Sequence, residues 1–257
     1  MLLAIDAGNT QIVFGARVED GWRSFRIATR PQATEDELAA VLLNVLKLGG
    51  IDQFPTGIVI ASVVPPLNET FSRLAAKWLG CKPLFVTHDL PLGITIAYDP
   101  PSAVGADRLA NAVAAESLVG SPAIVVDFGT AVTLDVVSSQ KEYLGGSILP
   151  GIYLALESLA GKTSKLPAID LSEESPQAIG KTTPESLRSG VLLGTAGAVE
   201  SLIGRIKLEL GGDAAVVATG GLATRIAGLC PSIHRVEPHL TLDGLRIIHN
   251  RMKHGEN

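Results

Sequence analysis

The chain contains two short turns of the same kind, and each follows a short apolar run. One turn reads Asp6-Ala-Gly-Asn-Thr10 and the other reads Asp127-Phe-Gly-Thr130. Each turn leads into a second strand-like stretch, and its glycine lets the backbone approach a ligand closely. The threonine hydroxyl and the turn N–H groups can donate hydrogen bonds to phosphates, while the aspartate can hold a cation or its waters. We therefore expect a polyphosphate cradle at each turn.

A simpler interpretation is available, because Asp-Gly pairs also mark ordinary β-hairpin turns. In this chain, however, Ala7 or Phe128 separates the aspartate from the glycine. Each aspartate also ends a strand of the buried type, where a bare carboxylate is costly without a cation or hydrogen-bond donors. The two turns therefore favour phosphate or cation binding. Their recurrence predicts a duplicated domain with a nucleotide held between the copies.

The order of strand-like and helix-like segments supports this duplication. The first half predicts strands near residues 2–5, 11–18 and 22–27, then a helix opened by the capping box Thr34 to Glu37, then a buried strand over 57–64. The second half restarts at Ala123 and repeats this plan, and no low-complexity linker separates the halves. We expect an α/β fold with an N-terminal lobe of residues 1–118 and a C-terminal lobe of residues 119–257.

Composition restricts the class of protein. The 257 residues, 46% of them apolar, can bury a sizeable core, and a net charge of −5 without a basic cluster argues against a nucleic-acid surface. Asp6 interrupts the first apolar run, and no later run reaches the length of a membrane helix. Two cysteines are too few for a disulfide framework. We expect a cytoplasmic protein without nucleic-acid or membrane partners.

Two further patterns, the possible metal ligands and the P-loop-like strings, do not predict a functional site. The five histidines and two cysteines lack the spacing of metal ligands, so no soft metal site is predicted. Gly161-Lys-Thr163 and Gly180-Lys-Thr182 imitate a P-loop, but both lack its first glycine and neither follows a buried strand. P-loop kinases are therefore excluded.

Gly105-Ala-Asp-Arg108 opens an alanine-rich helix over residues 106–118 and has two interpretations. In the first, Asp107 merely stabilises the helix N-terminus through the macrodipole. In the second, Asp107 is a general base and Arg108 holds an anionic substrate. The string alone fits both equally well, although no other loop aspartate is as well placed for proton transfer.

Three glycine motifs also remain open. Thr219-Gly-Gly221 lies where a strand meets a helix, and it is either a tight turn or a flat surface on which an adenine ring can stack. Gly145-Gly146 and Pro150-Gly151 mark either hinges or points of close ligand approach.

Together these motifs resemble the acetate and sugar kinase, Hsp70 and actin superfamily, and within it the type III pantothenate kinases. The similarity covers nearly the whole chain in the family's order, and the strings that carry it are Asp6-Ala-Gly-Asn-Thr10, Gly105-Ala-Asp-Arg108, Asp127-Phe-Gly-Thr130, Gly145-Gly-Ser-Ile-Leu-Pro-Gly151, Thr163-Ser-Lys-Leu-Pro167, Ser186-Leu-Arg-Ser-Gly190 and Leu240-Thr-Leu-Asp-Gly-Leu245. The resemblance implies two actin- and ribonuclease-H-like lobes, each a mixed sheet flanked by helices, with a nucleotide cleft between them. It also implies ATP-dependent phosphorylation of pantothenate, the first step of coenzyme A biosynthesis.

The resemblance implies roles for individual residues as well. Asp107 is the proton acceptor, and Asp127 binds a monovalent cation, K⁺ or NH₄⁺. ATP with Mg²⁺ is placed at the first turn, and further ATP contacts at the second turn and the double glycine: Asp6, Gly8, Asn9, Thr10, Thr130, Gly220 and Gly221. Pantothenate is placed against a loop tyrosine, the Gly-Ala-Asp-Arg string and one threonine: Tyr98, Gly105, Ala106, Asp107, Arg108 and Thr183.

One position departs from the family, which usually has Asn-Thr where this chain has Thr182-Thr183. Thr183 is retained, whereas Thr182 alters the local hydrogen bonding. Thr182-Thr-Pro-Glu185 would in any case cap a helix. The family forms homodimers, and apolar helices over residues 109–118 and 191–203 could supply that surface.

Two rival functions remain. One is another two-lobed phosphotransferase or phosphatase, such as a sugar kinase or an exopolyphosphatase. The other is a non-catalytic, nucleotide-binding regulatory protein of the same fold. The presence of Asp6, Asp107 and Asp127 argues against such a degenerate site.

Overall fold

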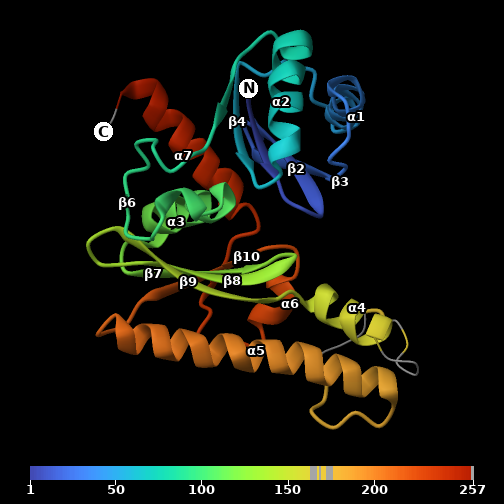
Figure 1. The fold of residues 1–257 in the computed structure, drawn as a ribbon, viewed down its shortest axis with the longest axis vertical. Helices are drawn as coiled ribbons and strands as arrows, with labels where there is room; N and C mark the ends of the chain where they lie inside the picture. Colours follow the sequence, from blue (N-terminus) through green and yellow to red (C-terminus); the bar gives the residue numbers. More distant parts are fainter. Residues whose placement is uncertain (163–166, 168, 172–175, 256–257) are drawn as a thin grey trace. The chain divides into compact units, whose positions relative to one another are not determined.

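The computed structural model describes residues 1–162, 167, 169–171 and 176–255 (Figure 1). The chain divides into two compact units, Met1–Ser117 with His239–Asn257, and Leu118–Pro238. The sequence places residues 239–257 with the C-terminal lobe, whereas the structure groups them with the first unit. The string Thr163–Leu166 lies outside the described residues, as does Thr163 of the first P-loop-like string.

The sheet of the first unit has the strand order β3-β2-β1-β4-β5. Its strands are β1 Leu2–Ala7, β2 Gln11–Val18, β3 Gly21–Ala28, β4 Gly57–Ser62 and β5 Pro83–Phe85. β1 to β3 form the predicted antiparallel meander, whereas β4 and β5 run parallel to β1. β1 and β4 are nearly continuous apolar runs, which is typical of strands covered on both faces.

The remaining elements of the first unit are α1 Glu35–Leu48, α2 Pro65–Leu74, the π-helix η1 Ala75–Leu79, β6 Thr95–Ile96, the 3₁₀ helix η2 Pro101–Ala103, α3 Ala106–Val119 and α7 Leu240–His254. The predicted capping box of α1 is confirmed, because the Thr34 hydroxyl accepts the Glu37 N–H and the Glu37 carboxylate accepts the Thr34 N–H. α1 and α2 bury leucines and a phenylalanine in the core of this unit.

The C-terminal helix α7 explains why residues 239–257 join the first unit. It packs against β1 and β4. The Trp22 Nε1–H of β3 donates to the Asp243 carboxylate at 3.0 Å, and the Thr241 hydroxyl donates to Asn111 Oδ1 of α3 at 2.8 Å. Asn111 is buried, so this contact satisfies a polar group that would otherwise be costly. The long-range packing of α7, rather than its position in the chain, sets its unit.

The second unit repeats the plan around its own sheet, whose strands lie in the order β11-β10-β7-β8-β9. These strands are β7 Ala123–Phe128, β8 Ala131–Val137, β9 Glu142–Pro150, β10 Ala215–Thr219 and β11 Arg235–Val236. β7 pairs antiparallel with the following strand β8 and parallel with the later strand β10. β1 has the same two kinds of neighbour. The shared arrangement confirms the predicted α/β fold with two related sheets.

The helices of the second unit are α4 Ile152–Lys162, α5 Thr183–Glu209 and α6 Ala223–Ala227. α5 extends along one face of the sheet (Figure 1). It buries Leu192, Ala196, Val199 and Ile203, which recur three or four residues apart and therefore lie on one face of the helix. No helix among the described residues combines the length and the apolar character needed to cross a membrane.

Most of the apolar residues of α3 contribute to the core of the chain. Those from Leu109 to Ala115 are buried within the single chain, whereas Leu118 is 39% exposed. A contribution of α3 to a dimer surface stays a prediction.

Candidate active site

The first predicted phosphate turn is a hairpin between β1 and β2, formed by residues 8–10. The Gly8 N–H donates to the Gln11 carbonyl at 3.0 Å, and the Thr29 hydroxyl donates to the Gly8 carbonyl at 2.6 Å. Asp6, which precedes the turn, is half-buried, whereas Asn9 and Thr10 are exposed. The turn is therefore held firmly by the sheet, and its tip remains open to a ligand.

Asp107 lies in the first turn of α3. Its Oδ1 accepts the backbone N–H of Arg108 at 2.8 Å, so the carboxylate folds back over the helix N-terminus. A Cβ on Gly105 would lie 2.5 Å from the same oxygen, so the glycine provides the space that this carboxylate occupies. Burial raises the pKa of Asp107, and the neighbouring N–H and charge of Arg108 oppose that change. A carboxyl group with a raised pKa is a stronger base when ionised.

The structure brings Asp107 to the same edge of the sheet as the first turn. A Cβ on Gly105 would lie 3.4 Å from the side chain of Val63, which directly follows β4. The Val63 N–H in turn donates at 3.0 Å to the carbonyl of Ala7, the residue after Asp6. Ligands of open α/β sheets bind beyond the carboxyl ends of parallel strands. The carboxyl ends of the parallel strands β1 and β4 form such an edge, and the first turn and Asp107 both lie at it.

The remaining predicted pantothenate residues of the first unit lie close to Asp107 along the chain. Tyr98 is half-buried in the segment between β6 and η2. On α3, Ala106 is buried and Arg108 is half-buried. Their contacts with a substrate stay a prediction.

The second predicted turn joins β7 to β8 through Gly129 and Thr130. The Gly129 N–H donates to the Ala131 carbonyl at 3.1 Å, and Thr130 is exposed. Asp127 is half-buried, with Oδ1 only 3.2 Å from where a Cβ on Gly129 would lie. The glycine therefore leaves room beside the carboxylate, as Gly105 does beside Asp107.

Asp127 lies in a row of oxygen-bearing side chains. It pairs in register with Thr133 of β8 and with Thr219 of β10, and paired residues share a face of the sheet. Hard oxygen ligands suit alkali and alkaline-earth cations. Within the described part of the chain, no group of three or more His, Cys, Asp or Glu residues could hold a metal ion.

Gly220 packs directly on the second turn. Its φ is +96°, and a Cβ would lie 2.5 Å from Asp127 Oδ1 and 2.6 Å from the carbonyl carbon of Phe128. The tight-turn interpretation of this glycine is confirmed by that geometry. The adjacent Gly221 is exposed, and the adenine contact predicted for the pair stays a prediction.

The other two glycine motifs are explained by close approach of the chain to itself. A Cβ on Gly146 would lie 1.7 Å from the carbonyl oxygen of Leu134. A Cβ on Gly151 would lie 2.0 Å from the carbonyl oxygen of Thr130. The sequence left a hinge and a close ligand approach open as explanations for these glycines. Neither explanation is needed, because the backbone of the chain itself lies this close.

Thr183 is the first residue of α5 and is exposed. The preceding Thr182 is the N-cap, and its hydroxyl accepts the Glu185 N–H at 3.3 Å. The predicted helix cap is thus confirmed. Asparagine and threonine are both preferred N-cap residues, so Thr182 can fill the same local role as the asparagine that is usual in the family. Binding of pantothenate by Thr183 stays a prediction.

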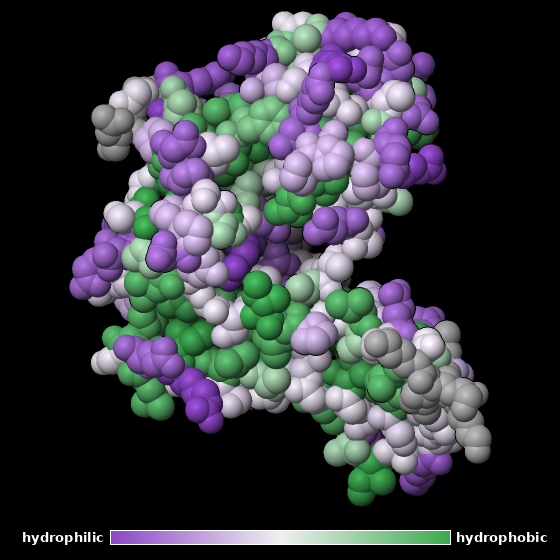
Figure 2. Space-filling model, viewed as in Figure 1, coloured by the Kyte–Doolittle hydropathy of each residue, from purple (hydrophilic) through white to green (hydrophobic). Residues whose placement is uncertain are grey.

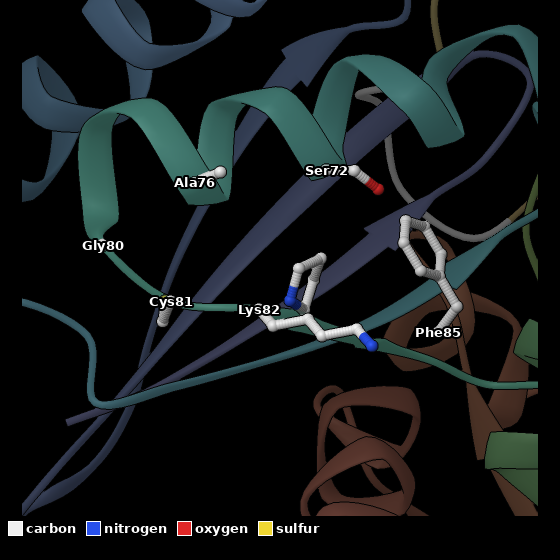
Figure 3. A pocket seen from close by; sticks show the side chains of 7 residues that line it. Ser72, Ala76, Gly80, Cys81, Lys82 and Phe85 are labelled. Carbon is white, nitrogen blue, oxygen red and sulfur yellow. The ribbon is translucent and has the colours of Figure 1, made fainter.

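A hollow of about 530 Å³ that the sequence did not indicate lies at the β5 edge of the first sheet (Figure 3). It is lined by Ser72, Ala76, Gly80, Cys81, Lys82, Pro83 and Phe85. The described residues predicted for the site are absent from this lining. Burial raises the pKa of the Cys81 thiol, which makes it a poor nucleophile at neutral pH. The hollow therefore contains none of the described residues that the sequence assigns to the reaction.

Comparisons with known proteins show the family to which the chain belongs. The family profile described as type III pantothenate kinase matches residues 2–205. A type III pantothenate kinase of Moorella thermoacetica is 44% identical over 253 residues, which cover 98% of this chain and 99% of the relative. One of Myxococcus xanthus is 41% identical over 256 residues, covering 98% of each chain.

Solved structures show the same fold at low sequence identity. A Campylobacter jejuni protein, described as a candidate Baf family transcriptional activator, has a TM-score of 0.63 and 19% identity, covering 98% of this chain and 99% of its own. A candidate N-acetylmannosamine kinase of Listeria monocytogenes has a TM-score of 0.53 and 12% identity, covering 100% and 99%. These likenesses show the fold of the chain. The family profile over residues 2–205 and the full-length sequence relatives show that the chain belongs to the type III pantothenate kinase family.

Proposed function

We infer that this chain transfers the γ-phosphoryl group of ATP to the primary hydroxyl of pantothenate, the first step of coenzyme A biosynthesis, with Asp107 as the general base. Family membership, at 44% identity over 98% of the chain, supports the reaction. The structural observation that carries the assignment of the base is the position of Asp107. Its carboxylate occupies space left by Gly105 at the edge where β1 and β4 end.

Asp107 is suited to accept the proton of the attacking hydroxyl. The backbone N–H of Arg108 holds Oδ1 at 2.8 Å, which leaves the second carboxylate oxygen for the substrate. Arg108 is a candidate partner for the pantothenate carboxylate, because guanidinium groups bind carboxylates through two parallel hydrogen bonds. Tyr98, in the preceding loop, is a candidate hydrogen-bond donor to the same substrate. Proton transfer by a positioned base typically contributes about 10²- to 10⁴-fold to the rate.

The first turn is suited to bind phosphate groups. Its exposed tip presents backbone N–H groups, Asn9 and the Thr10 hydroxyl, and Gly8 keeps the approach free of a Cβ. Asp6 is the carboxylate that would hold Mg²⁺ or its waters, and the half-buried position at the end of β1 fits that role. Mg²⁺, when bound, neutralises the negative charge on the phosphates. Phosphoryl transfer depends mainly on positioning and charge stabilisation, which these groups supply.

In the second unit, we propose that Thr130, Gly220 and Gly221 contact ATP and that Asp127 binds K⁺ or NH₄⁺. The support is the oxygen row at Asp127 and the packing of Gly220 against the same carboxylate. A bound monovalent cation supplies positive charge beside the phosphates.

The assay that tests this function is a coupled measurement of ADP release with pantothenate, ATP and Mg²⁺, with KCl replaced by tetramethylammonium chloride in a parallel series. We expect turnover that requires pantothenate and rises with K⁺ concentration. Glucose, N-acetylmannosamine and polyphosphate serve as alternative substrates. Turnover of one of these in place of pantothenate would identify a different phosphotransferase, and nucleotide binding without any turnover would identify a regulatory protein.

We also propose a homodimer, and its support is an exposed apolar surface on the second unit. Leu144 and Ile148 of β9 and Tyr153 and Leu154 of α4 are each at least 42% exposed. Apolar side chains interrupt the polar surface in the space-filling view (Figure 2). Clustered exposed apolar side chains commonly mark protein contacts.

We expect sedimentation equilibrium at micromolar concentration to give twice the mass of the chain, and Leu154→Asp to shift the protein to monomers. Leu208→Asp is the matched control, because Leu208 of α5 is 81% exposed. A wild-type monomer, or equal weakening by both variants, would contradict this surface as the interface.

A further inference from the structure

A fully buried carboxylate lies in the middle of β8, and the mechanism above does not use it. Asp135 has no exposed surface. The Tyr143 hydroxyl donates to its Oδ1 at 2.7 Å, and the Thr133 hydroxyl donates to its Oδ2 at 3.0 Å. Burial of a carboxylate is costly unless such donors compensate it. A residue that imposes this cost inside an otherwise apolar strand calls for a role that an apolar side chain could not perform.

The register between β8 and β9 brings the Tyr143 hydroxyl to Asp135. The direct partner of Asp135 on β9 is Gly146, whereas Tyr143 pairs with Val137 two residues further along β8. Tyr143 therefore reaches Asp135 diagonally, a distance that aromatic side chains can span. Gly146 allows β9 to lie close to the β8 backbone beside Asp135, because a Cβ there would lie 1.7 Å from the Leu134 carbonyl oxygen and 3.3 Å from the Asp135 Cα. The double glycine and the buried tyrosine thus form one arrangement around Asp135.

This arrangement determines how the Thr133 hydroxyl is oriented. A threonine hydroxyl has one hydrogen to donate and two lone pairs to accept. Because the hydrogen is donated to Asp135, only the lone pairs remain for other partners. Thr133 is the direct cross-strand partner of Asp127, so their Cβ atoms are about 4.5–5.5 Å apart on one face of the sheet. An ionised Asp127 also offers only acceptor oxygens, so the two groups together can coordinate a cation.

We infer that Asp135 and Tyr143 are positioning residues that hold the Thr133 hydroxyl with its lone pairs toward Asp127, which makes Thr133 Oγ1 a ligand of the monovalent cation. This inference rests on the cation site proposed at Asp127. Thr133 acts directly on the cation, while Asp135 and Tyr143 act through Thr133. Groups in such outer positions typically change metal affinity by about 10- to 100-fold when they are removed.

The test compares Thr133→Val and Tyr143→Phe with the control Ser138→Ala. Ser138 is also a buried hydroxyl of the β8–β9 hairpin, and it bonds to Glu142 and the backbone rather than to Asp135. Two quantities are measured: the K⁺ concentration that gives half-maximal kinase activity, and the rise in Tm caused by KCl relative to tetramethylammonium chloride at equal ionic strength. The second reports cation binding independently of activity.

We expect Thr133→Val and Tyr143→Phe to raise the half-activating K⁺ concentration by about tenfold or more and to reduce the KCl-dependent rise in Tm. For Tyr143→Phe, the rate at saturating K⁺ should change by less than about threefold, since the base, the phosphate turn and the cation ligands are untouched. Ser138→Ala should lower Tm without changing either response to K⁺. Thr133→Ser keeps the hydroxyl and should retain the wild-type K⁺ response. This variant also tests the inference if Thr133→Val does not fold.

A lower Tm for Thr133→Val and Tyr143→Phe, with an unchanged half-activating K⁺ concentration, would show that the network is only structural and would overturn the inference. A wild-type kinase that does not respond to K⁺ would also overturn it, together with the cation site but not the phosphorylation of pantothenate. Absence of pantothenate turnover, with a KCl-dependent Tm that is sensitive to Thr133, would overturn the proposed reaction while the inference stands.

Discussion

Replacement of Asp107 by asparagine should lower the turnover of pantothenate by about two orders of magnitude or more, the usual scale for loss of a general base. Asparagine preserves the shape of the side chain and can still accept the Arg108 N–H, so α3 and the ends of β1 and β4 should keep their arrangement. ATP affinity should therefore remain close to that of the wild type. Steady-state kinetics and equilibrium nucleotide binding measure the two quantities separately.

The pH dependence provides a second readout of the same residue. The base works in its ionised form, so kcat/KM must fall as the pH drops through the pKa of Asp107. Burial raises that pKa above the ordinary value of 3.8, which moves the acidic limb of the profile to higher pH. The asparagine variant should lose this limb from its residual activity. Asp52→Asn is the control, because Asp52 is exposed, and near-wild-type turnover of Asp107→Asn would remove Asp107 from the mechanism.

Gly244→Ala should destabilise the protein, unlike alanine at the glycines of α5, where a Cβ would meet no atom within 4 Å. Gly244 of α7 lies against α3, where a Cβ would be 1.9 Å from the carbonyl oxygen of Ala110 and 2.5 Å from its carbonyl carbon. These are backbone atoms, so the collision cannot be relieved by a side-chain rotation. Overpacking of this kind costs about 1–3 kcal/mol, and we expect a loss near the upper end. Because α3 also carries Asp107, kcat should fall as well.

Gly197→Ala is the matched control for this prediction. Gly197 lies within the long helix α5, and a Cβ there would meet no atom within 4 Å. Alanine is a better helix former than glycine, so this variant should raise the free energy of unfolding by about 0.5–1 kcal/mol. Urea unfolding followed by circular dichroism gives both values. Equal stability of the two variants would show that the α3–α7 contact is not as tight as the structure indicates.

The packing of Gly244 also gives a physical role to the Leu240–Leu245 string. From the sequence alone, this string is part of the family resemblance but has no assigned role. Thr241 of that string donates to the buried Asn111 at 2.8 Å. Both contacts join α7 to α3, the helix whose first turn contains Asp107. The string therefore stabilises the element that holds the proposed base, and it does so from the far end of the chain.

Features that depend on neighbouring residues could be predicted from the sequence. Both aspartate turns, the capping box at Thr34 and the helix cap at Thr182 are set by hydrogen bonds between residues only a few positions apart. Strand and helix periodicity likewise identified the α/β fold. The sequence could not choose between a cap and a base for Asp107. The structure shows that the carboxylate contacts the helix backbone and lies at the edge where β1 and β4 end.

The Asp135 network could not be predicted in the same way. The only signal in the sequence is a charged residue within an apolar strand, because nothing local indicates that Tyr143 reaches it across a strand pair with an irregular register. The same limit applies to the glycines at 146 and 151, whose necessity depends on which backbone atoms lie opposite.

The sequence by itself determined the two aspartate turns, the α/β class and the family, because these follow from short-range patterns of polarity, glycine and hydrogen bonding. The tertiary structure decided the unit to which α7 belongs, the meeting of Gly105–Asp107 with the ends of β1 and β4, and the orientation of Thr133. These features depend on which distant segments pack together, and packing is decided by shape and by strand register over the whole sheet. Neither can be read from residues that are close in the chain.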